Sequence, residues 1–299
     1  MPRATVATTN PDRVEIEYET FGSPDDPALL LVNGFTSQLL GWELGLVEAF
    51  VGRRRHVIRF DNRDVGLSTH LDGQRVDAMA VLSASLKGQP IPSVPYTLSD
   101  MAADAVGLLD HLGIEQAHVL GASMGGMIAQ TIAIEHPGRC LTLTSVMSSP
   151  GDPRAGKPTK EALGVLLAPP PSERDAYIAA SENAGVYSSK KWFDPVRARA
   201  RAAASYDRCF YPEGSSRQLA AIYASGDRTA LLHGVEIPTL VIHGRDDELI
   251  TPSGGTMTAE AIPEANLLLL AHMGHDIPEQ LWPVVVDAVI SHQDAAAWA

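Results

Sequence analysis

The amino-acid sequence predicts an α/β fold, in which a mostly parallel sheet is flanked by helices, and two observations carry this prediction. Short apolar runs of strand length recur along the chain and are separated by helical patterns, which is the order that builds parallel sheets. This alternation stops between about residues 149 and 236, where helical patterns follow one another without a convincing strand. We expect that stretch to be a helical cap inserted into the sheet domain.

Each predicted element rests on its own pattern. Residues 14–19 alternate between apolar and polar side chains, which is typical of a half-exposed edge strand. Residues 28–32 are apolar throughout, as in strands that are buried on both faces. The helix expected at residues 98–112 is the clearest, because the capping box of Thr97 and Asp100 opens it. The remaining predicted strands are residues 56–60, 117–120, 141–146, 239–243 and 266–270.

The predicted domain boundaries follow from the break in the alternation. Residues 1–148 and 233–299 are expected to form the sheet core, and residues 149–232 the cap. A second irregular stretch, residues 71–95, is too long for a plain connection and is predicted to be lid-like. The cap contains aromatic side chains that either pack its helices or line a pocket beneath it, namely Trp192, Phe193, Tyr206, Phe210 and Tyr211.

Length, charge and cysteine content exclude several classes of protein. With 299 residues, 45% of them hydrophobic, the chain can bury a full core. Its formal net charge of −13 argues against nucleic acid or an anionic membrane surface as a partner. No run approaches the roughly 18 apolar residues of a membrane span, and no secretory signal is recognised. Because Cys140 and Cys209 fall in different predicted units, we expect no disulfide framework and a cytoplasmic protein.

The most informative motif runs from Gly121 to Gly125, with Ser123 at its centre, between a predicted strand and a helix-forming run. A serine between two glycines on a sharp strand-to-helix turn is a nucleophile elbow. The glycines are needed because the serine adopts a strained backbone conformation and a bulky neighbour would collide with the strand or the helix. The helix that follows directs free backbone N–H groups at negative charge that forms beside the serine.

A serine hydroxyl needs a base, and the base needs a third group that orients it. In proteins with this elbow the acid and then the histidine follow the serine along the chain. The turn after the penultimate predicted strand offers three acids, of which Asp247 is our choice, Asp246 the alternative and Glu248 the third. The loop after the last predicted strand offers His275 as the base, while His272 lies near the strand end and is expected to point elsewhere.

The chemistry also needs two donors for the oxyanion that develops on the carbonyl oxygen. The elbow supplies the backbone N–H of Met124, and the loop after residues 28–32 supplies the backbone N–H of Phe35, with Gly34 allowing the turn. The sequence shows no metal-ligand cluster, phosphate-binding glycine loop, or flavin or nicotinamide fingerprint, so no cofactor is predicted.

Five segments together resemble the α/β-hydrolase superfamily: residues 33–35, 61–68, 121–126, 244–252 and 274–275. The pair Arg63-Asp64 and the Ser-Met-Gly-Gly elbow look most similar to actinobacterial esterases such as the aclacinomycin methylesterases. The resemblance implies an α/β-hydrolase fold with a triad of Ser123, Asp247 and His275, and with Phe35 and Met124 as the oxyanion hole. It also implies a structural role for residues 61–68, with Arg63 bonding backbone or acidic partners beneath the site. Many members have His-Gly where this chain has Asn33-Gly34.

The expected function is that of a cofactor-free serine hydrolase, which cleaves a carboxylic ester of a small to mid-sized, largely apolar substrate through an acyl-enzyme. The same triad performs other acyl chemistry, so lactonase, carbon–carbon bond hydrolase, proline iminopeptidase-like amidase and perhydrolase activities stay open. A non-catalytic ligand-binding module is the alternative from a different class. Haloalkane dehalogenases and epoxide hydrolases are excluded, because they need an aspartate where this chain has Ser123. The expected partner is a small-molecule ester rather than nucleic acid or membrane, and the oligomeric state is not predicted.

Overall fold

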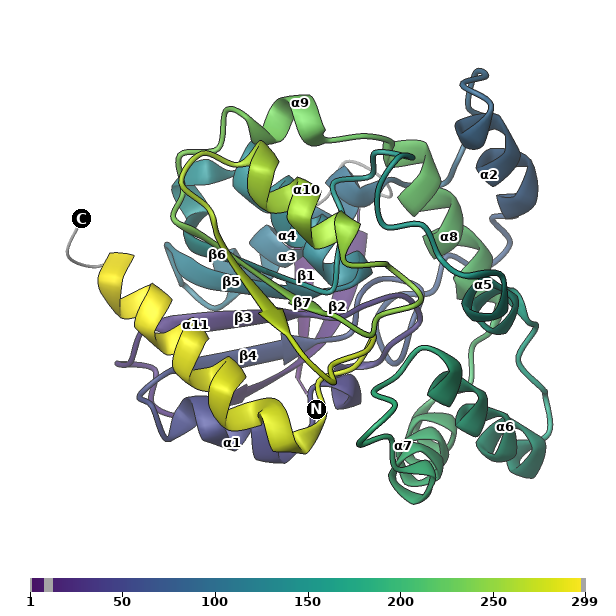
Figure 1. Ribbon diagram of the computed structural model, residues 1–299, viewed down its shortest axis with the longest axis horizontal. Coiled ribbons are helices and arrows are strands. Elements are labelled where there is room, and N and C mark those ends of the chain that lie inside the picture. The colour runs from purple at the N-terminus through teal and green to yellow at the C-terminus, as the bar shows by residue number, and fades with distance from the viewer. Residues whose placement is uncertain (1, 8–12, 297–299) are drawn as a thin grey trace.

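A computed structural model describes residues 2–7 and 13–296, and within them one sheet of eight strands forms the centre of the molecule (Figure 1). The strands are β1 (Arg3–Ala7), β2 (Arg13–Phe21), β3 (Ala28–Val32), β4 (His56–Phe60), β5 (Ala117–Ala122), β6 (Cys140–Val146), β7 (Thr239–Gly244) and β8 (Asn266–Leu270). They lie in the order β1-β2-β4-β3-β5-β6-β7-β8. The pairs β1–β2 and β2–β4 are antiparallel and all the others are parallel, so the prediction of a mostly parallel sheet is confirmed.

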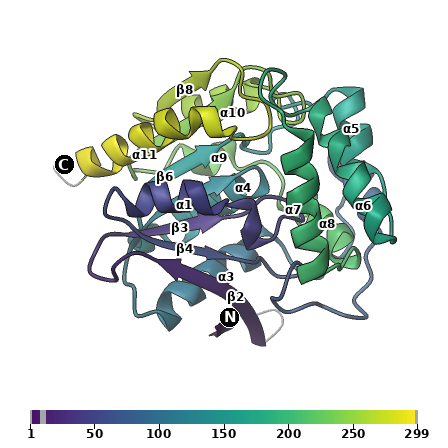
Figure 2. The ribbon, with the colours of Figure 1, turned by 90° about the horizontal axis from the view of Figure 1, so that it is seen from below.

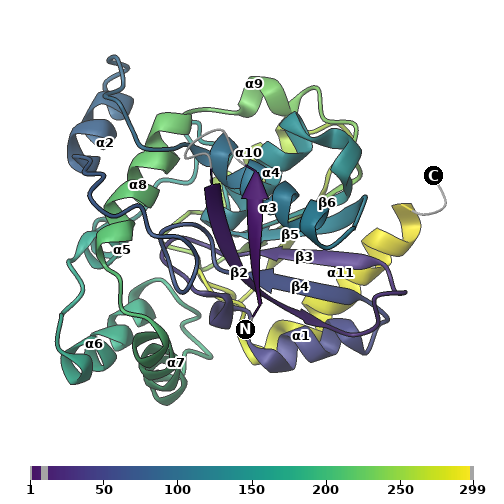
Figure 3. The same cartoon turned by 180° about the vertical axis from the view of Figure 1, so that it is seen from behind.

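The prediction that residues 14–19 form an edge strand is wrong. β1 pairs along the outer side of β2, with Ala4 opposite Ile16 (Figure 3). Both side chains are fully buried, because the helix over residues 98–111 packs on β1. The alternation in β2 therefore reflects a strand that is covered mainly on one face, while the short run that extends the sheet was not recognised in the sequence.

Helices cover both faces of the sheet (Figures 1 and 3). One face carries α1 (Leu44–Val51) and α11 (Trp282–Ala296), which pack against each other. The opposite face carries α3 (Leu98–His111), α4 (Met124–Glu135) and α10 (Ser253–Ala261). α3 begins at the predicted capping box, in which Thr97 and Asp100 each bond the other's backbone N–H.

The central strand β3 shows why its sequence is apolar throughout. Leu29 and Leu31 belong to the hydrophobic cluster under α1 and α11, whereas Leu30 and Val32 belong to the cluster under α3 and α4. All four side chains are fully buried. Successive side chains of a strand point to opposite faces, so a strand covered on both sides needs apolar residues at every position.

Residues 149–232, called the insertion below, are all described and contain helices but no strand. The α-helices are α5 (Lys160–Leu167), α6 (Arg174–Ala180), α7 (Pro195–Arg208), α8 (Glu213–Ser225) and α9 (Thr229–Leu232), and a 3₁₀ helix, η3 (Ser181–Val186), follows α6. α5 to α8 lie together at one side of the sheet (Figure 2). α9, which the predicted boundary also assigns to the cap, instead contacts α4 and α10 of the core.

The stretch predicted to be irregular, residues 71–95, contains the helix α2 (Ala78–Leu86). The side chain of Asp77 caps this helix by accepting the backbone N–H of Ala80. α2 packs against α8, where Val81 and Ala220 are both fully buried (Figure 3). This part of the core therefore supports the insertion.

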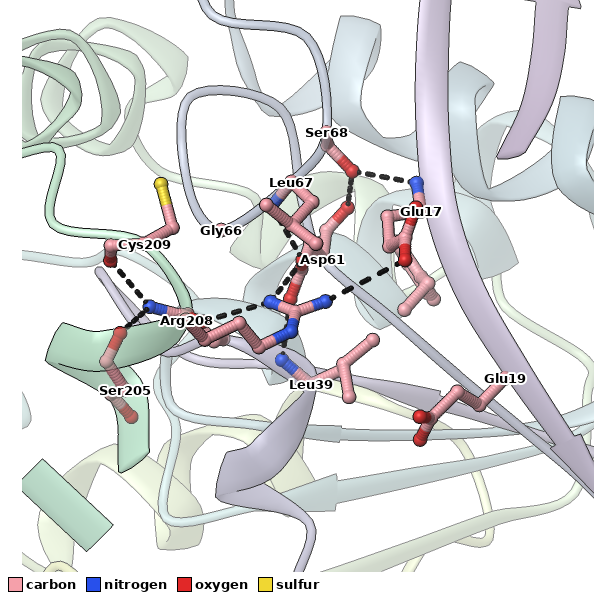
Figure 4. A network of polar contacts seen from close by, with 12 residues as sticks. Glu17, Glu19, Leu39, Asp61, Gly66, Leu67, Ser68, Ser205, Arg208 and Cys209 are labelled. Carbon is pink, nitrogen blue, oxygen red and sulfur yellow. Dashed lines mark hydrogen bonds and ion pairs between the residues drawn. The ribbon is translucent and has the colours of Figure 1, made fainter. Parts of the chain in front are cut away.

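A buried ion pair joins the end of α7 to the core (Figure 4). Arg208 Nη1 donates to Asp61 Oδ2 at 2.7 Å and to Gln38 Oε1 at 2.8 Å. Gln38 Nε2 in turn donates to two backbone carbonyls of the insertion, those of Ser205 and Cys209. Burial raises the pKa of Asp61, although the charge of Arg208 and several hydrogen bonds oppose that shift. The insertion is thus anchored by a charge pair whose carboxylate is fully buried and whose arginine side chain is 9% exposed.

Among residues 2–7 and 13–296, no helix combines the length and the apolar character that crossing a membrane requires. Cys140 and Cys209 are both free thiols.

Candidate active site

Ser123 stands at the junction of β5 and α4 in the conformation that the elbow motif requires. Its φ of 58° and ψ of −122° lie in a region that residues with a side chain rarely occupy. Hydrogen bonds to the neighbouring strand and loop help to hold it there: its backbone N–H donates to Val146 O at 2.9 Å, and its carbonyl accepts the Ser148 hydroxyl at 2.8 Å. The end of β6 and the loop that follows it therefore hold the serine in its strained conformation.

The flanking glycines are needed because backbone passes close by. A Cβ on Gly121 would overlap the carbonyl oxygen of Gly125, and a Cβ on Gly125 would overlap that of Val32. No side chain fits at either position without moving the strand or the helix. The predicted reason for the two glycines is confirmed.

The structure brings together the three side chains that the sequence analysis selected. His275 Nε2 lies 2.9 Å from Ser123 Oγ, and His275 Nδ1 lies 2.8 Å from Asp247 Oδ2. A neutral imidazole that donates from Nδ1 to the carboxylate leaves Nε2 free to accept the serine proton. The histidine side chain is 8% exposed and that of Asp247 is fully buried. The arrangement can activate a hydroxyl for nucleophilic attack.

The carboxylate of Asp247 is held by more than the histidine. Its Oδ1 accepts the backbone N–H groups of Leu249 and Ile250, each at 2.9 Å. Burial alone would raise the pKa of Asp247, but the charge of His275 and the hydrogen bonds from His243 and His275 outweigh burial and lower it to about 2. The group is therefore ionised at neutral pH and can orient the imidazole.

The alternative acids have other partners. Asp246 Oδ2 lies 3.9 Å from His272 Nδ1, and these side chains are 37% and 50% exposed. Glu248 Oε1 lies 3.3 Å from the ammonium group of Lys190 in the insertion. Of the three acids on this turn, the structure places only Asp247 against His275.

The two predicted oxyanion donors belong to segments that meet at the serine. Met124 is the first residue of α4, so its backbone N–H has no partner within the helix. The loop after β3 approaches so closely that a Cβ on Gly34 would lie 3.2 Å from Ser123 Cβ and 3.8 Å from its hydroxyl oxygen. Phe35, the next residue, lines the space beside Ser123. The loop can therefore present a backbone donor to a carbonyl oxygen bound at the serine.

The insertion supports this loop through one buried side chain. Gln218 on α8 is fully buried; its Oε1 accepts the backbone N–H of Thr36 at 2.8 Å and its Nε2 donates to Arg63 O at 2.9 Å. Thr36 has a φ of 55°, a left-handed conformation that a β-branched residue seldom adopts. No local pattern in the sequence could have indicated this contact, because 182 residues separate its two partners.

Residues 61–68, one of the segments that resemble the family, lie beneath the site and are held by buried polar contacts. Arg63 was expected to bond backbone or acidic partners, and it does both: Nε and Nη2 donate to the two carboxylate oxygens of Asp104 at 2.6 and 2.7 Å, and Nη2 donates to Asp100 O at 3.3 Å. The side chain of Asn33 donates to Phe60 O at 2.9 Å, and its backbone carbonyl accepts from the side chain of Asn62 at 3.0 Å. The asparagine thus fastens the start of the oxyanion loop to the end of β4.

Ser123 opens onto two cavities. The first, of about 520 Å³, is bounded by His275 and by aromatic side chains of both the core and the insertion, namely Trp42, Tyr177, Tyr187 and Trp282. The second, of about 370 Å³, is bounded by Met124 and by apolar side chains of α4, α5 and α8, namely Met127, Leu163, Leu219 and Ile222. Leu166, Leu249 and Phe35 border both.

The aromatic residues that the sequence analysis named are not the ones that line these cavities. Tyr206 and Phe210 stack on each other, with centroids 4.7 Å apart, and pack against Tyr177. Tyr211 stacks on His70 at 3.7 Å. Tyr187 and Tyr177, which were not singled out, border the first cavity instead. Which face of an insertion helix meets the core depends on packing that the aromatic pattern does not encode.

Within the described part of the chain, no group of three or more histidine, cysteine, aspartate or glutamate side chains is placed to hold a metal ion.

The family model described as the alpha/beta hydrolase fold matches residues 27–280, which confirms the fold expected from the sequence. Rhodomycin D methylesterase DnrP of Streptomyces peucetius is 28% identical over 95% of this chain and 97% of its own length. The 3-oxoadipate enol-lactonase 2 of Acinetobacter baylyi is 27% identical over 93% of each chain. Among solved structures, the enol-lactonase of Burkholderia xenovorans has a TM-score of 0.72 at 22% identity, over 98% of this chain and 100% of that one.

Proposed function

Because the chain belongs to the alpha/beta hydrolase fold family, we propose that it is a cofactor-free serine hydrolase that cleaves a carboxylic ester through an acyl-enzyme. The observation that carries this proposal is the continuous relay from Ser123 Oγ through His275 to Asp247, with contacts of 2.9 and 2.8 Å. The similarity to a curated methylesterase over nearly the whole chain supports ester chemistry in particular.

In the proposed reaction, His275 Nε2 takes the hydroxyl proton as Ser123 Oγ bonds to the carbonyl carbon. The backbone N–H groups of Met124 and Phe35 stabilise the negative oxygen. The bond to the alcohol oxygen then breaks, and His275 returns the proton to that oxygen. Water attacks the acyl-enzyme with His275 again as base, the acid leaves and the serine regains its proton. Asp247 stays ionised and keeps the imidazole oriented throughout.

A fluorophosphonate probe tests whether the serine is reactive. The unmodified protein is expected to label at one equivalent, and Ser123→Ala is expected to lose both labelling and esterase activity. Ser99→Ala serves as the control, because that hydroxyl lies on α3 and donates to Glu135 away from the site. Absence of labelling in the unmodified protein would favour a ligand-binding module over an enzyme.

Lactone hydrolysis is a second candidate, favoured by the similarity to an enol-lactonase over 93% of the chain. A lactone places its acyl carbon and its alcohol oxygen in one ring, and the same relay opens it. A rate survey across p-nitrophenyl esters, five- and six-membered lactones and proline arylamides separates these possibilities. Faster turnover of the lactones or the arylamides than of any ester would replace the ester assignment.

A further inference from the structure

The two cavities at Ser123 are bordered by different parts of the proposed catalytic machinery. His275, which would protonate the departing alcohol, borders the first cavity. Met124, whose N–H would hold the oxyanion, borders the second. Ser123 and Phe35 border both. The site therefore has distinct directions in which the two halves of an ester can extend from the reacting carbon.

The chemistry of acyl transfer assigns a half of the substrate to each cavity. The leaving oxygen must come within hydrogen-bond reach of the imidazole that protonates it. With the carbonyl oxygen held at the Met124 and Phe35 N–H groups, the carbon chain of the acid occupies the remaining direction, away from His275. The alcohol must therefore leave through the cavity bordered by His275, and the acyl chain must lie in the other.

Resting on the proposed function, we infer that the substrate joins a mid-sized apolar acyl group, held in the second cavity, to a bulkier alcohol, held in the first. The second cavity, at about 370 Å³, is walled by Met127, Leu163 and Ile222, and its lining also includes the charged residues Asp152, Lys157, Asp227 and Arg228. The apolar side chains predominate in this lining and match an alkyl or aryl acid of moderate size, since apolar walls reward apolar burial.

The first cavity is the more polar of the two. At about 520 Å³ it combines aromatic walls with the polar side chains of Gln38, Glu43, Arg201 and Asp276. Arg201 Nη1 donates to Glu43 Oε1 at 3.2 Å, so the positive charge on this wall already has a negative partner. A neutral alcohol that carries ring systems and hydroxyl or amide groups fits this lining better than an anion does. A methyl ester would leave most of the first cavity without substrate atoms.

Narrowing each cavity separately tests the assignment. Ile222→Trp, on α8, fills part of the second cavity, and Ala184→Trp, in the insertion, fills part of the first. Rates are measured on p-nitrophenyl esters from acetate to decanoate, and on acetate esters of methanol, benzyl alcohol and 2-naphthylmethanol. Ile222→Trp is expected to lower kcat/KM for the decanoate by about 10-fold or more, but by less than about 2-fold for the acetate. Ala184→Trp is expected to lower kcat/KM for the naphthylmethyl ester by about 10-fold or more, but by less than about 2-fold for the methyl ester.

Single-turnover kinetics add a readout that general loss of structure would not produce. After the alcohol has left, the acyl-enzyme contains only the acid, so Ala184→Trp should leave the deacylation rate unchanged. Ile222→Trp should change deacylation for octanoyl and decanoyl groups. Leu163→Ala, which widens the second cavity, should shift the preferred acyl length upward and leave the alcohol preference alone.

The outcomes separate this inference from the function on which it rests. Loss of fluorophosphonate labelling with Ser123→Ala, together with the crossed pattern above, supports both. Three outcomes with labelling intact overturn the assignment of the cavities and leave the hydrolase proposal standing. The pattern could be reversed, both substitutions could affect both ester series alike, or methyl esters of bulky acids could be preferred. No labelling and no turnover of any ester overturns both.

Discussion

The loops of the sheet core and the helices of the insertion contribute to the site in different ways. Ser123, Asp247 and His275 all follow strands of the core, and their reacting atoms come from these loops. The insertion contributes walls and, at the same loops, backbone contacts. His275 N donates to Tyr187 O at 2.7 Å, and Thr159 N donates to Glu248 O at 2.9 Å.

This difference shows that the insertion is more than a cover over the cavities. Gln218 adds a third contact, to the oxyanion loop, so each of the three loops that meet at the serine is bonded to the insertion. Gly274, on the loop that carries His275, also packs directly on the insertion, because a side chain there would overlap the backbone of Tyr187 and Ser188. The core determines which chemistry is possible, and the insertion determines how closely its parts are held.

The largest effect expected from the comparison is at the acid of the core. Asp247→Asn keeps the shape of the turn but lets His275 adopt the wrong tautomer, so kcat should fall by about 10⁴-fold. Asp246→Asn is the matched control, since that neighbouring carboxylate is 37% exposed and pairs with His272. Steady-state kinetics on one p-nitrophenyl ester measure both. A loss for Asp246→Asn as large as that for Asp247→Asn would refute the assignment of the acid.

The next effect concerns the anchor between the two regions. Arg208→Met removes the cation beside Asp61, a carboxyl group that is fully buried, so the free energy of unfolding should fall by about 3–5 kcal/mol. Urea unfolding measures this loss. Adding Asp61→Asn to Arg208→Met should recover part of it, because position 61 then carries no charge, while the other buried acid beside Arg208, Glu17, keeps Arg3 as a partner.

The surface pair of Arg174 and Asp207, whose side chains are 46% and 55% exposed, provides the control for that experiment. Arg174→Met should have a much smaller effect, because water already screens this pair. If both arginine substitutions destabilise the chain equally, the anchor at Arg208 has no special role.

The core of the site could be predicted because its signals are local. The residues 121–125 specify a turn whose glycines are required by contacts within one strand–helix junction, and chain order then selected His275. The choice between Asp246 and Asp247 needed coordinates, because one residue of turn geometry decides which carboxylate faces the imidazole. The missed outer strand β1 belongs to the same class of error, since nothing near residues 14–19 says what pairs beside them.

The insertion could be predicted as helical but not as a set of contacts. The contact between Thr36 and Gln218 and that between Asp61 and Arg208 join residues 182 and 147 positions apart. Both polar partners lie on helices whose sequences are ordinary surface patterns, and their burial follows from how α7 and α8 dock. The helix α2 was overlooked for a similar reason, because much of its apolar surface is matched by α8 rather than by the sheet.

Gln218 tests whether the insertion positions the chemistry. Gln218→Leu leaves the N–H of Thr36 without its acceptor, so the oxyanion loop should loosen. We expect kcat to fall by about 10- to 100-fold with little change in KM, because the donor acts mainly in the transition state. Gln218→Glu keeps an acceptor for Thr36 but replaces the donor to Arg63 O with an oxygen, so it should recover only part of the loss.

Gln293→Leu is the matched control for Gln218→Leu. Gln293 is 1% exposed and accepts from Arg55 at 2.7 Å, on α11 away from the oxyanion loop. The Gln293→Leu substitution should lower the free energy of unfolding without lowering kcat. Equal kcat losses for the two leucine variants would mean that the effect of Gln218 is general destabilisation.

The smallest expected effect is a loss of folding stability at low pH that arises in the core sheet. Burial lowers the pKa of His118 on β5 to about 4, with a further contribution from the charge of Arg55. The unfolded chain takes up this proton near pH 6.5, whereas the folded chain resists it until about pH 4, so stability is lost as the pH falls between these values. From pH 7 to pH 5 the loss should be about 2 kcal/mol.

Urea unfolding at both pH values should show that His118→Leu removes most of this difference, while His111→Gln, at an exposed helix end, does not. An unchanged difference in His118→Leu would place the acid-sensitive step outside the sheet, and the insertion would then be the first region to examine.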